Sequence, residues 1–268
     1  MTPRRILLAV AVAALVLAVA GRWGHGRGDE RAAALPQASA GEAASIPAVP
    51  APALRVGPPV PQSKGGGESR WAPVRRATVA RVAPRAGAKA IAPLSTRTPE
   101  GTTNLVLALD RHEDAGRRLW VRVRLPVLPT GAVGWVPREN LGGYRMVDTH
   151  LVVDLRRLDA VLLRGGRRVF RAPVGVGTAA APTPRGKFYV RDQLTRFRSR
   201  FYGPLAFGTS ARSPTLTDWP GGGFIGIHGT DRPDLLPGRV SHGCIRLANR
   251  DVLRLGRLMP VGTPITIR

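Results

Sequence analysis

Residues 225 to 251 read "IGIHGTDRPDLLPGRVSHGCIRLANRD" and contain Cys244, the one cysteine in a chain of 268 residues. Two histidines precede this cysteine: His228 lies upstream at the end of an apolar run, and His242 lies two positions before it. A cysteine thiol becomes a useful nucleophile when a neighbouring imidazole accepts its proton. The stretch therefore predicts a thiol–imidazole site, and from the residues alone either histidine could supply the base.

Two other interpretations of Cys244 are open. The first is a small apolar side chain that fills a buried space, which is a common role for an unpaired cysteine. The second is a zinc site made of Cys244, His242 and His228. The His-Gly-Cys spacing is too tight for both side chains to bind one ion in tetrahedral geometry, and the paired cysteines of structural zinc sites are absent. We therefore expect no metal and no cofactor.

Gly243 is the residue immediately before the cysteine. A glycine lacks a β-carbon and permits a tight turn. Such a turn can direct backbone amides toward one point, and acyl transfer needs donors of this kind for the charge that develops on the carbonyl oxygen. The segment "TDRPDLLPGRV" that precedes the turn has two prolines and a glycine, which is typical of a surface loop that carries binding residues.

The N-terminus predicts export. Arg4 and Arg5 are followed by an apolar run from Ile6 to Ala20, so residues 1–21 are expected to be a signal peptide or a signal anchor. The length of the run leaves cleavage and membrane retention equally open. An exported chain with a single thiol cannot close an internal disulfide, so Cys244 pairs with another chain or is reactive.

The composition is strongly basic. The chain has 41 Lys plus Arg against 17 Asp plus Glu, a net charge of +24, and only 5% aromatic residues. The arginines are scattered along the chain and do not cluster with aromatic residues, so we expect no nucleic acid as a partner. Attraction to anionic envelope polymers is the alternative that the charge leaves open.

Two segments precede the reactive region. Residues 22–70 are rich in Ala, Pro and Gly and predict a disordered linker. Residues 71–142 contain short β-prone runs between turn residues and predict a small β-barrel. In the clearest run one face is apolar and the other is not: Leu119, Val121, Val123 and Leu125 alternate with Trp120, Arg122 and Arg124. The segment "WVRVRLPVLPTGAVGWVPRENL" resembles the bacterial Src-homology-3-like modules that often accompany cell-wall enzymes.

Residues 148–268 predict a mainly β domain with few helices. Four runs such as "GKFYVRDQL" read as strands. A single late helix is indicated by Asn249 as a candidate cap, by apolar residues at three-residue spacing from Val252, and by Pro260 as its end.

The segment "HGTDRPDLLPGRVSHGCIRLANRD" resembles the signature of the L,D-transpeptidases with a YkuD-type catalytic domain. The resemblance covers residues 148–268. It also includes an upstream Thr-Pro-x-Gly-x-Phe stretch, whose residues here are Thr183, Pro184, Gly186 and Phe188. The resemblance implies a β-sandwich-like catalytic domain. The N-terminal export signal predicts a place in the cell envelope, either anchored to the membrane or secreted to the wall.

The resemblance also implies roles for individual residues. Cys244 matches the nucleophile, His228 the general base, and the carbonyl of Gly229 the group that orients the imidazole. The backbone amides of His242, Gly243 and Cys244 match the oxyanion site. Two further residues are expected near the substrate, namely Arg246, which could hold a carboxylate, and Ser241, which is expected mainly to support the loop.

The implied reaction is cysteine acyl transfer on peptidoglycan stem peptides. The thiolate attacks the carbonyl of the third stem residue, a terminal D-alanine leaves, and an amine of a second stem resolves the thioester into a cross-link. Two alternatives are open: an L,D-carboxypeptidase, in which water replaces the acceptor, and a wall-binding protein without catalysis. The membrane is expected as a partner only through an uncleaved N-terminal segment.

Overall fold

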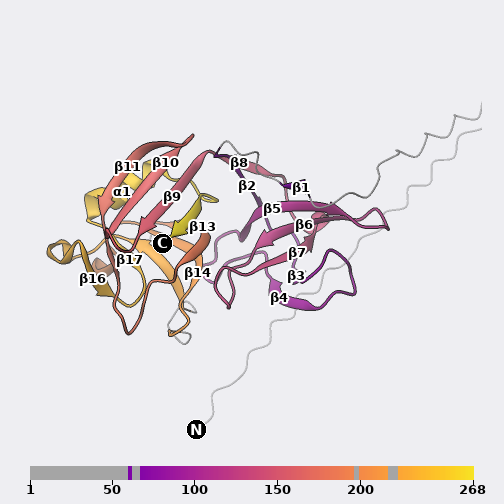
Figure 1. Cartoon of the computed structure of the whole chain (residues 1–268), viewed down its shortest axis with the longest axis horizontal. Coiled ribbons are helices and arrows are strands. Elements are labelled where there is room, and N and C mark those ends of the chain that lie inside the picture. Colours follow the sequence, from indigo (N-terminus) through magenta and orange to yellow (C-terminus); the bar gives the residue numbers. More distant parts are fainter. Residues whose placement is uncertain (1–59, 62–66, 196–198, 217–222) are drawn as a thin grey trace, which may run out of the picture. The chain divides into compact units, whose positions relative to one another are not determined.

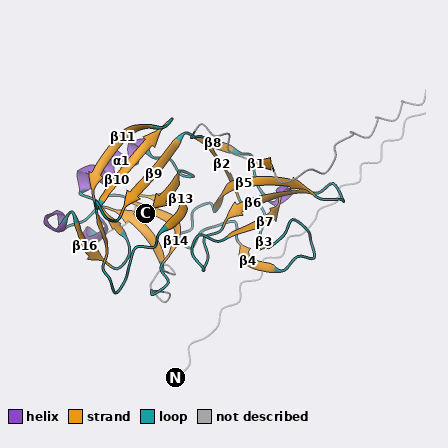
Figure 2. Ribbon diagram, in the orientation of Figure 1, coloured by secondary structure: helices purple, strands orange, loops and turns teal. Residues whose placement is uncertain are grey.

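The computed structural model describes residues 60–61, 67–195, 199–216 and 223–268, and all of them fall within one compact unit. The predicted signal segment and most of the predicted linker lie outside the described residues. Within the described part of the chain, no helix is both long and apolar enough to cross a membrane. Strands dominate (Figure 2), so the predicted mainly β fold with few helices is confirmed.

The first sheet has eight strands in the order β4-β3-β7-β6-β5-β2-β8, with β1 paired to β5 (Figure 1). Its strands are β1 (Val60–Pro61), β2 (Ser69–Pro73), β3 (Thr78–Arg81), β4 (Ala90–Leu94), β5 (Leu105–Glu113), β6 (Leu119–Arg124), β7 (Val133–Pro137) and β8 (Arg145–Val147); the short 3-10 helix η1 (Arg138–Asn140) follows β7.

The strands of this sheet begin earlier than predicted. Val60 pairs with Arg111 of β5, and Ser69 pairs with Val147 of β8. Strand pairing is therefore present at Val60–Pro61 and from Ser69 onward, within the range predicted as linker, and the bounds of the linker stay a prediction. The likeness to Src-homology-3-like modules stays a prediction.

The alternation predicted in β6 holds for most of the strand. Val121, Val123 and Leu125 are buried in the core of the first sheet. The pattern is wrong at the start of the strand, where Leu119 is 46% exposed and Trp120 is 1% exposed. Trp120 is held on the buried side by a hydrogen bond, because its indole N–H donates to the Asp114 carboxylate in the preceding hairpin at 2.8 Å.

The second sheet has ten strands in the order β11-β10-β9-β18-β13-β14-β15-β17-β12-β16. Its strands are β9 (Thr149–Asp154), β10 (Asp159–Arg164), β11 (Arg167–Pro173), β12 (Gly175–Gly177), β13 (Gly186–Leu194), β14 (Ala206–Arg212), β15 (Phe224–His228), β16 (Gly238–Ser241), β17 (Ile245–Arg246) and β18 (Pro264–Ile267); two 3-10 helices, η2 (Arg200–Tyr202) and η3 (Pro233–Leu235), lie in its connections.

One α-helix is present in the described residues, α1 (Asn249–Leu258). Val252 and Leu255 are buried in the core of the second sheet, and Leu258 packs against that core, as the spacing predicts. The predicted cap is wrong. Asn249 is the first helical residue, and Ala248 occupies the cap position without a side-chain hydrogen bond. The Asn249 side chain instead accepts a 3.0 Å hydrogen bond from the amide of Thr230, which secures the chain just after β15.

Candidate active site

Strand pairing brings His228 and the cysteine loop together. His228 is the last residue of β15, and Cys244 immediately precedes β17. These two strands are parallel neighbours, with Ile227 opposite Ile245 and His228 opposite Arg246. The fifteen residues between His228 and Cys244 therefore form a loop whose two ends are fixed side by side in the sheet.

Gly226 lies close to the side chains of both Cys244 and His228. Residues two apart in a strand point to the same face, so Gly226 shares a face with His228 and leaves space there. A β-carbon at Gly226 would lie 3.7 Å from Cys244 Sγ and 3.7 Å from His228 Cδ2. Its amide donates to Cys244 Sγ at 3.3 Å. The thiol and the imidazole therefore border one small gap, which the missing side chain keeps open.

The imidazole of His228 is fixed in orientation and tautomer. Nδ1 lies 2.6 Å from the carbonyl oxygen of Gly229, and a carbonyl can only accept, so Nδ1 carries the hydrogen. Nε2 is then the nitrogen with the lone pair. It is buried and has no hydrogen-bond partner among the described residues. The ring of Tyr202 packs edge-on against the imidazole, with 4.8 Å between ring centroids.

Burial keeps this pair of groups neutral at rest. Desolvation, assisted by the nearby Arg246 charge and opposed by the Gly229 hydrogen bond, lowers the pKa of His228 from 6.5 to about 4. Desolvation also raises the pKa of the Cys244 thiol, against the opposing effects of the Gly226 amide and Arg246. A neutral imidazole is able to accept a proton, and the thiol still holds one.

Two hydroxyl groups fix the turn before the cysteine. Ser241 is buried, and its Oγ donates to the Cys244 carbonyl at 2.6 Å and accepts from the Gly243 amide at 3.1 Å. Thr183 Oγ1 donates to the Gly243 carbonyl at 2.7 Å and accepts from the Gly177 amide at 2.8 Å. Gly243 itself has φ of +112°, a conformation that disfavours any side chain.

These contacts change the expected oxyanion site. The amide of Gly243 already donates to Ser241, so it is not available for a substrate oxygen in this arrangement. The backbone amides of His242 and Cys244 then remain as the expected donors to a substrate oxyanion. Ser241 is the last residue of β16 and is not among the residues that line the cavity.

A narrow cavity of about 50 Å³ opens onto the thiol. The residues that line it include four predicted from the sequence and three with aromatic rings: Cys244, His228, His242, Arg246, Phe201, Tyr202 and Phe224. These four predicted residues therefore line one cavity, although His242 is exposed and His228 is buried. The described residues hold no group of three or more His, Cys, Asp or Glu side chains placed to bind a metal ion.

Arg246 supplies positive charge at this cavity. The residue is 8% exposed, and its guanidinium carbon lies 4.4 Å from the centroid of the Phe201 ring. No ion pair found among the described residues involves it. A guanidinium held on an aromatic ring without a carboxylate partner can receive an anionic group.

A family model for the L,D-transpeptidase catalytic domain (YkuD) matches residues 148–267. The putative L,D-transpeptidase YkuD of Bacillus licheniformis is 34% identical over 145 residues, which cover 53% of this chain and 81% of that protein. The chain belongs to the L,D-transpeptidase family. The YkuD protein of Bacillus subtilis is 34% identical over 118 residues, and the present chain spans 65% of the length of that relative.

Solved structures are less similar to this chain. The catalytic domain of the E. faecium L,D-transpeptidase is 25% identical with a TM-score of 0.35, and the match covers 45% of this chain and 97% of that one. The Ldtfm–avibactam carbamoyl enzyme is 25% identical with a TM-score of 0.36, and the match covers 49% of that chain.

Sequence reasoning did not assign several residues of this site. Gly226 could have been found from the two-residue period of "GIH", which places a glycine on the face of the histidine. Thr183 was noticed only as part of a motif, and its two hydrogen bonds to Gly177 and Gly243 give it a role in the cysteine loop. Tyr202 carries no local signal, because it reaches the site from η2.

Proposed function

We propose that this chain is a peptidoglycan L,D-transpeptidase in which Cys244 is the nucleophile and His228 the general base. The observation that carries the proposal is the gap at Gly226, which both reactive side chains border, with Nδ1 of His228 already engaged by Gly229. Family membership supports the reaction class.

In the first step, Nε2 of His228 takes the thiol proton as Sγ attacks the carbonyl carbon of the third residue of a donor stem peptide. Because both groups are neutral at rest, proton transfer and attack are coupled in one event. The C–N bond to the terminal D-alanine then breaks, and its amine leaves with the proton from the imidazolium. The product is a thioester at Cys244.

In the second step, an amine of an acceptor stem attacks the thioester and gives its proton to His228. The C–S bond breaks, and the thiolate recovers that proton from the imidazolium. The amides of His242 and Cys244 are the proposed donors to the oxyanion in both steps. No metal or nucleotide takes part.

We assign Arg246 to a carboxylate of the stem peptide. The stacking of its guanidinium on Phe201 orients the planar group at the edge of the cavity, and bidentate contacts with a carboxylate would fix the register of the peptide. Ser241 supports this site through the loop.

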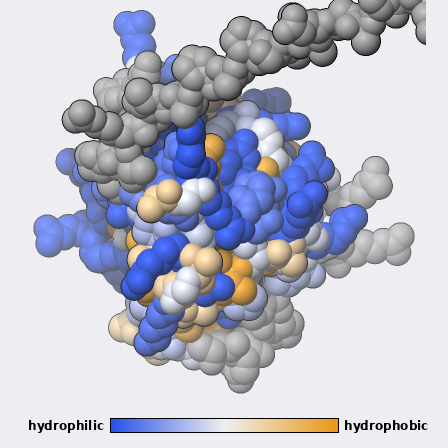
Figure 3. All heavy atoms as spheres, turned by 90° about the vertical axis from the view of Figure 1, so that its right-hand side faces the viewer, coloured by the Kyte–Doolittle hydropathy of each residue, from blue (hydrophilic) through white to orange (hydrophobic). Residues whose placement is uncertain are grey.

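We place the protein outside the cytoplasm, in the cell envelope, on the strength of the N-terminal sequence. Anionic envelope polymers are a second proposed partner, since one face of the molecule is dominated by hydrophilic side chains (Figure 3) and the chain carries a net charge of +24. Residues 71–142 are proposed as a Src-homology-3-like spacer that holds the catalytic domain among these polymers.

The test is incubation of the purified chain with a disaccharide tetrapeptide, followed by mass spectrometry of the products. A cross-linked dimer with release of D-alanine is expected. Tripeptide without dimer would replace the transferase by an L,D-carboxypeptidase with the same site. A folded sample that gives neither product would leave only the wall-binding alternative.

A further inference from the structure

Strand β13 is covered on both faces. Phe188 and Val190 belong to the core of the second sheet, whereas Tyr189 packs in a separate cluster with residues of the first sheet, including Leu105. The Tyr189 hydroxyl donates a 2.9 Å hydrogen bond to the Leu105 carbonyl. The start of β5 therefore lies against the face of β13 that carries Tyr189.

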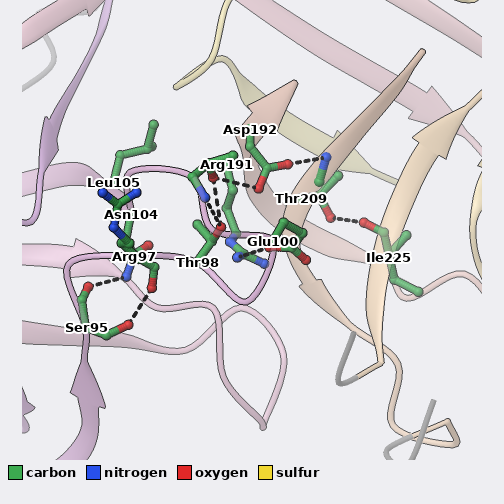
Figure 4. Close-up of polar contacts among 12 residues, drawn as sticks. Ser95, Arg97, Thr98, Glu100, Asn104, Leu105, Arg191, Asp192, Thr209 and Ile225 are labelled. Carbon is green, nitrogen blue, oxygen red and sulfur yellow. Dashed lines mark hydrogen bonds and ion pairs between the residues drawn. The ribbon is translucent and has the colours of Figure 1, made fainter. Parts of the chain in front are cut away.

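A β-bulge aims Arg191 out of this strand. Val190 pairs with Thr209 and Asp192 pairs with the preceding residue, Gly208, so Arg191 is the extra residue of β13. A bulge of this kind redirects one side chain. The Arg191 side chain is 1% exposed, and its NH2 group donates to Glu100 at 3.2 Å. Figure 4 shows the two side chains directed at one another.

The loop that carries Glu100 is attached to β13 a second time. Thr102 Oγ1 donates to the Asp192 carboxylate at 3.3 Å, and that carboxylate also accepts from the Gly208 amide at 2.9 Å. A hydrogen bond between the hydroxyls of Thr98 and Thr102 closes the loop itself at 2.8 Å. Glu100 is thus held in a fixed place relative to Arg191 and is not a freely moving surface acid.

The Arg191 guanidinium also meets the wall of the catalytic cavity. Its central carbon lies 3.9 Å from the centroid of the Phe224 ring. Phe224 is the first residue of β15 and lines the cavity that contains Cys244. A cation held over an aromatic ring is attracted to that ring and restrains it. The contacts run without a break from Glu100 through Arg191 to the cavity.

We infer that Glu100 is a positioning residue for the Cys244 cavity. Its carboxylate holds the Arg191 guanidinium over the Phe224 ring, and the restrained ring forms the wall against which the donor peptide binds. The identity of the peptide in this inference rests on the proposed function. The predicted effect of Glu100 on access to the Cys244 thiol does not.

The decisive variant is Glu100→Gln, which keeps the size of the side chain and removes its charge. The matched control is Glu113→Gln, because Glu113 makes a 3.3 Å ion pair with Arg117 and its side chain is 25% exposed, against 24% for Glu100. Arg191→Lys is a second variant. It retains a positive charge for Glu100 but loses the planar group that stacks on Phe224.

Two readouts are measured on the full chain. The first is the alkylation rate of Cys244 by bulky N-phenylmaleimide divided by its rate with small iodoacetamide. The second is KM for the tetrapeptide donor. In Glu100→Gln and Arg191→Lys we expect both to rise about threefold to tenfold, with KM changing more than kcat. Glu113→Gln should match the unaltered chain.

Phe224→Leu provides the test of connection. If Glu100 acts through this ring, adding Glu100→Gln to Phe224→Leu produces no further rise in either readout. Additive effects would overturn the inference, as would an alkylation ratio for Glu100→Gln equal to that of Glu113→Gln, even if the melting temperature falls. A shifted ratio in a chain that never turns over the tetrapeptide would keep the inference and reject the proposed function.

Discussion

Nδ1 of His228 donates a 2.6 Å hydrogen bond to the carbonyl oxygen of Gly229, the very next residue. This bond leaves Nε2 as the one basic nitrogen of the ring and directs the imidazole by a backbone group that no side-chain substitution can remove. In other nucleophile–histidine sites a carboxylate or an amide side chain has this role. A carbonyl carries no full charge, so the imidazole is oriented without being made strongly basic, and its pKa of about 4 follows from burial.

The two histidines of the motif should differ sharply in importance. We expect His228→Ala to reduce the rate of thioester formation by about 10²- to 10⁴-fold, because the general base is lost. His242→Ala should reduce it much less, since His242 is exposed at the rim of the cavity. The rates are measured by stopped-flow acylation with a carbapenem. The opposite ranking would reassign the base to His242.

The reactivity of the Cys244 thiol should depend on pH in the same way as that of an ordinary neutral thiol. Burial raises the pKa of Cys244 above its ordinary value of 9.0, so the thiolate population grows about tenfold for each pH unit up to that pKa. Iodoacetamide alkylation between pH 5 and 9 should therefore rise continuously. Glutathione serves as the reference thiol. A plateau of high reactivity below pH 7 would indicate a preformed thiolate–imidazolium pair and contradict the neutral resting state.

The buried imidazole should also make the fold sensitive to acid. The pKa of His228 is about 4 in the folded chain and 6.5 in the unfolded chain. As pH falls through this window, His228 therefore binds a proton in the unfolded chain but not in the folded chain. Stability is therefore lost between pH 6.5 and 4 and levels off below 4, by about 3 kcal/mol in total.

The measurement is urea unfolding at several pH values for the unaltered chain and for His228→Asn, whose amide can still donate to Gly229. Other groups titrate in both proteins and cancel in the difference. From pH 7.5 to 4, the free energy of unfolding of the unaltered chain should fall by about 3 kcal/mol relative to that of His228→Asn, and the gap between the two proteins should change by that amount. A gap that stays constant with pH would show that His228 keeps an ordinary pKa in the folded state.

Thr183 should matter to the cysteine loop through its hydroxyl alone. Thr183→Val leaves the Gly177 amide and the Gly243 carbonyl without their partner, and each buried unsatisfied group costs about 1–3 kcal/mol. We expect unfolding free energy to fall by about 2–4 kcal/mol and acylation to slow, whereas Thr183→Ser keeps the hydroxyl and stays close to the unaltered chain. Equal effects of the two substitutions would assign the role of Thr183 to its methyl group.

Local patterns predicted much of this fold. The two-residue period in β6, the three-residue spacing in α1 and the turn at Gly243 each depend on near neighbours in the chain, and each is present in the structure. Where the prediction was wrong, the side chain makes a hydrogen bond outside its own element. Trp120 donates to the Asp114 carboxylate, and Asn249 accepts from the Thr230 amide instead of capping its helix.

The candidate site was less accessible to sequence reasoning. The cysteine and both histidines were evident, but their residue types could not rank the histidines, because that ranking depends on burial and on the Gly229 carbonyl. The contact of Arg191 with Glu100 joins residues 91 positions apart, and no periodicity reveals such a pairing. The Gly243 amide is not available to a substrate oxygen because it donates to Ser241 Oγ, and the sequence does not reveal that hydrogen bond.

The central claim is that Cys244 is acylated. The most direct measurement is intact-protein and peptide mass spectrometry of the chain after incubation with a carbapenem, beside a Cys244→Ala variant whose folding is verified by circular dichroism. We predict a single adduct on the peptide that contains Cys244 and none on the variant. An unmodified chain after prolonged exposure, or an adduct that persists in Cys244→Ala, would contradict the account.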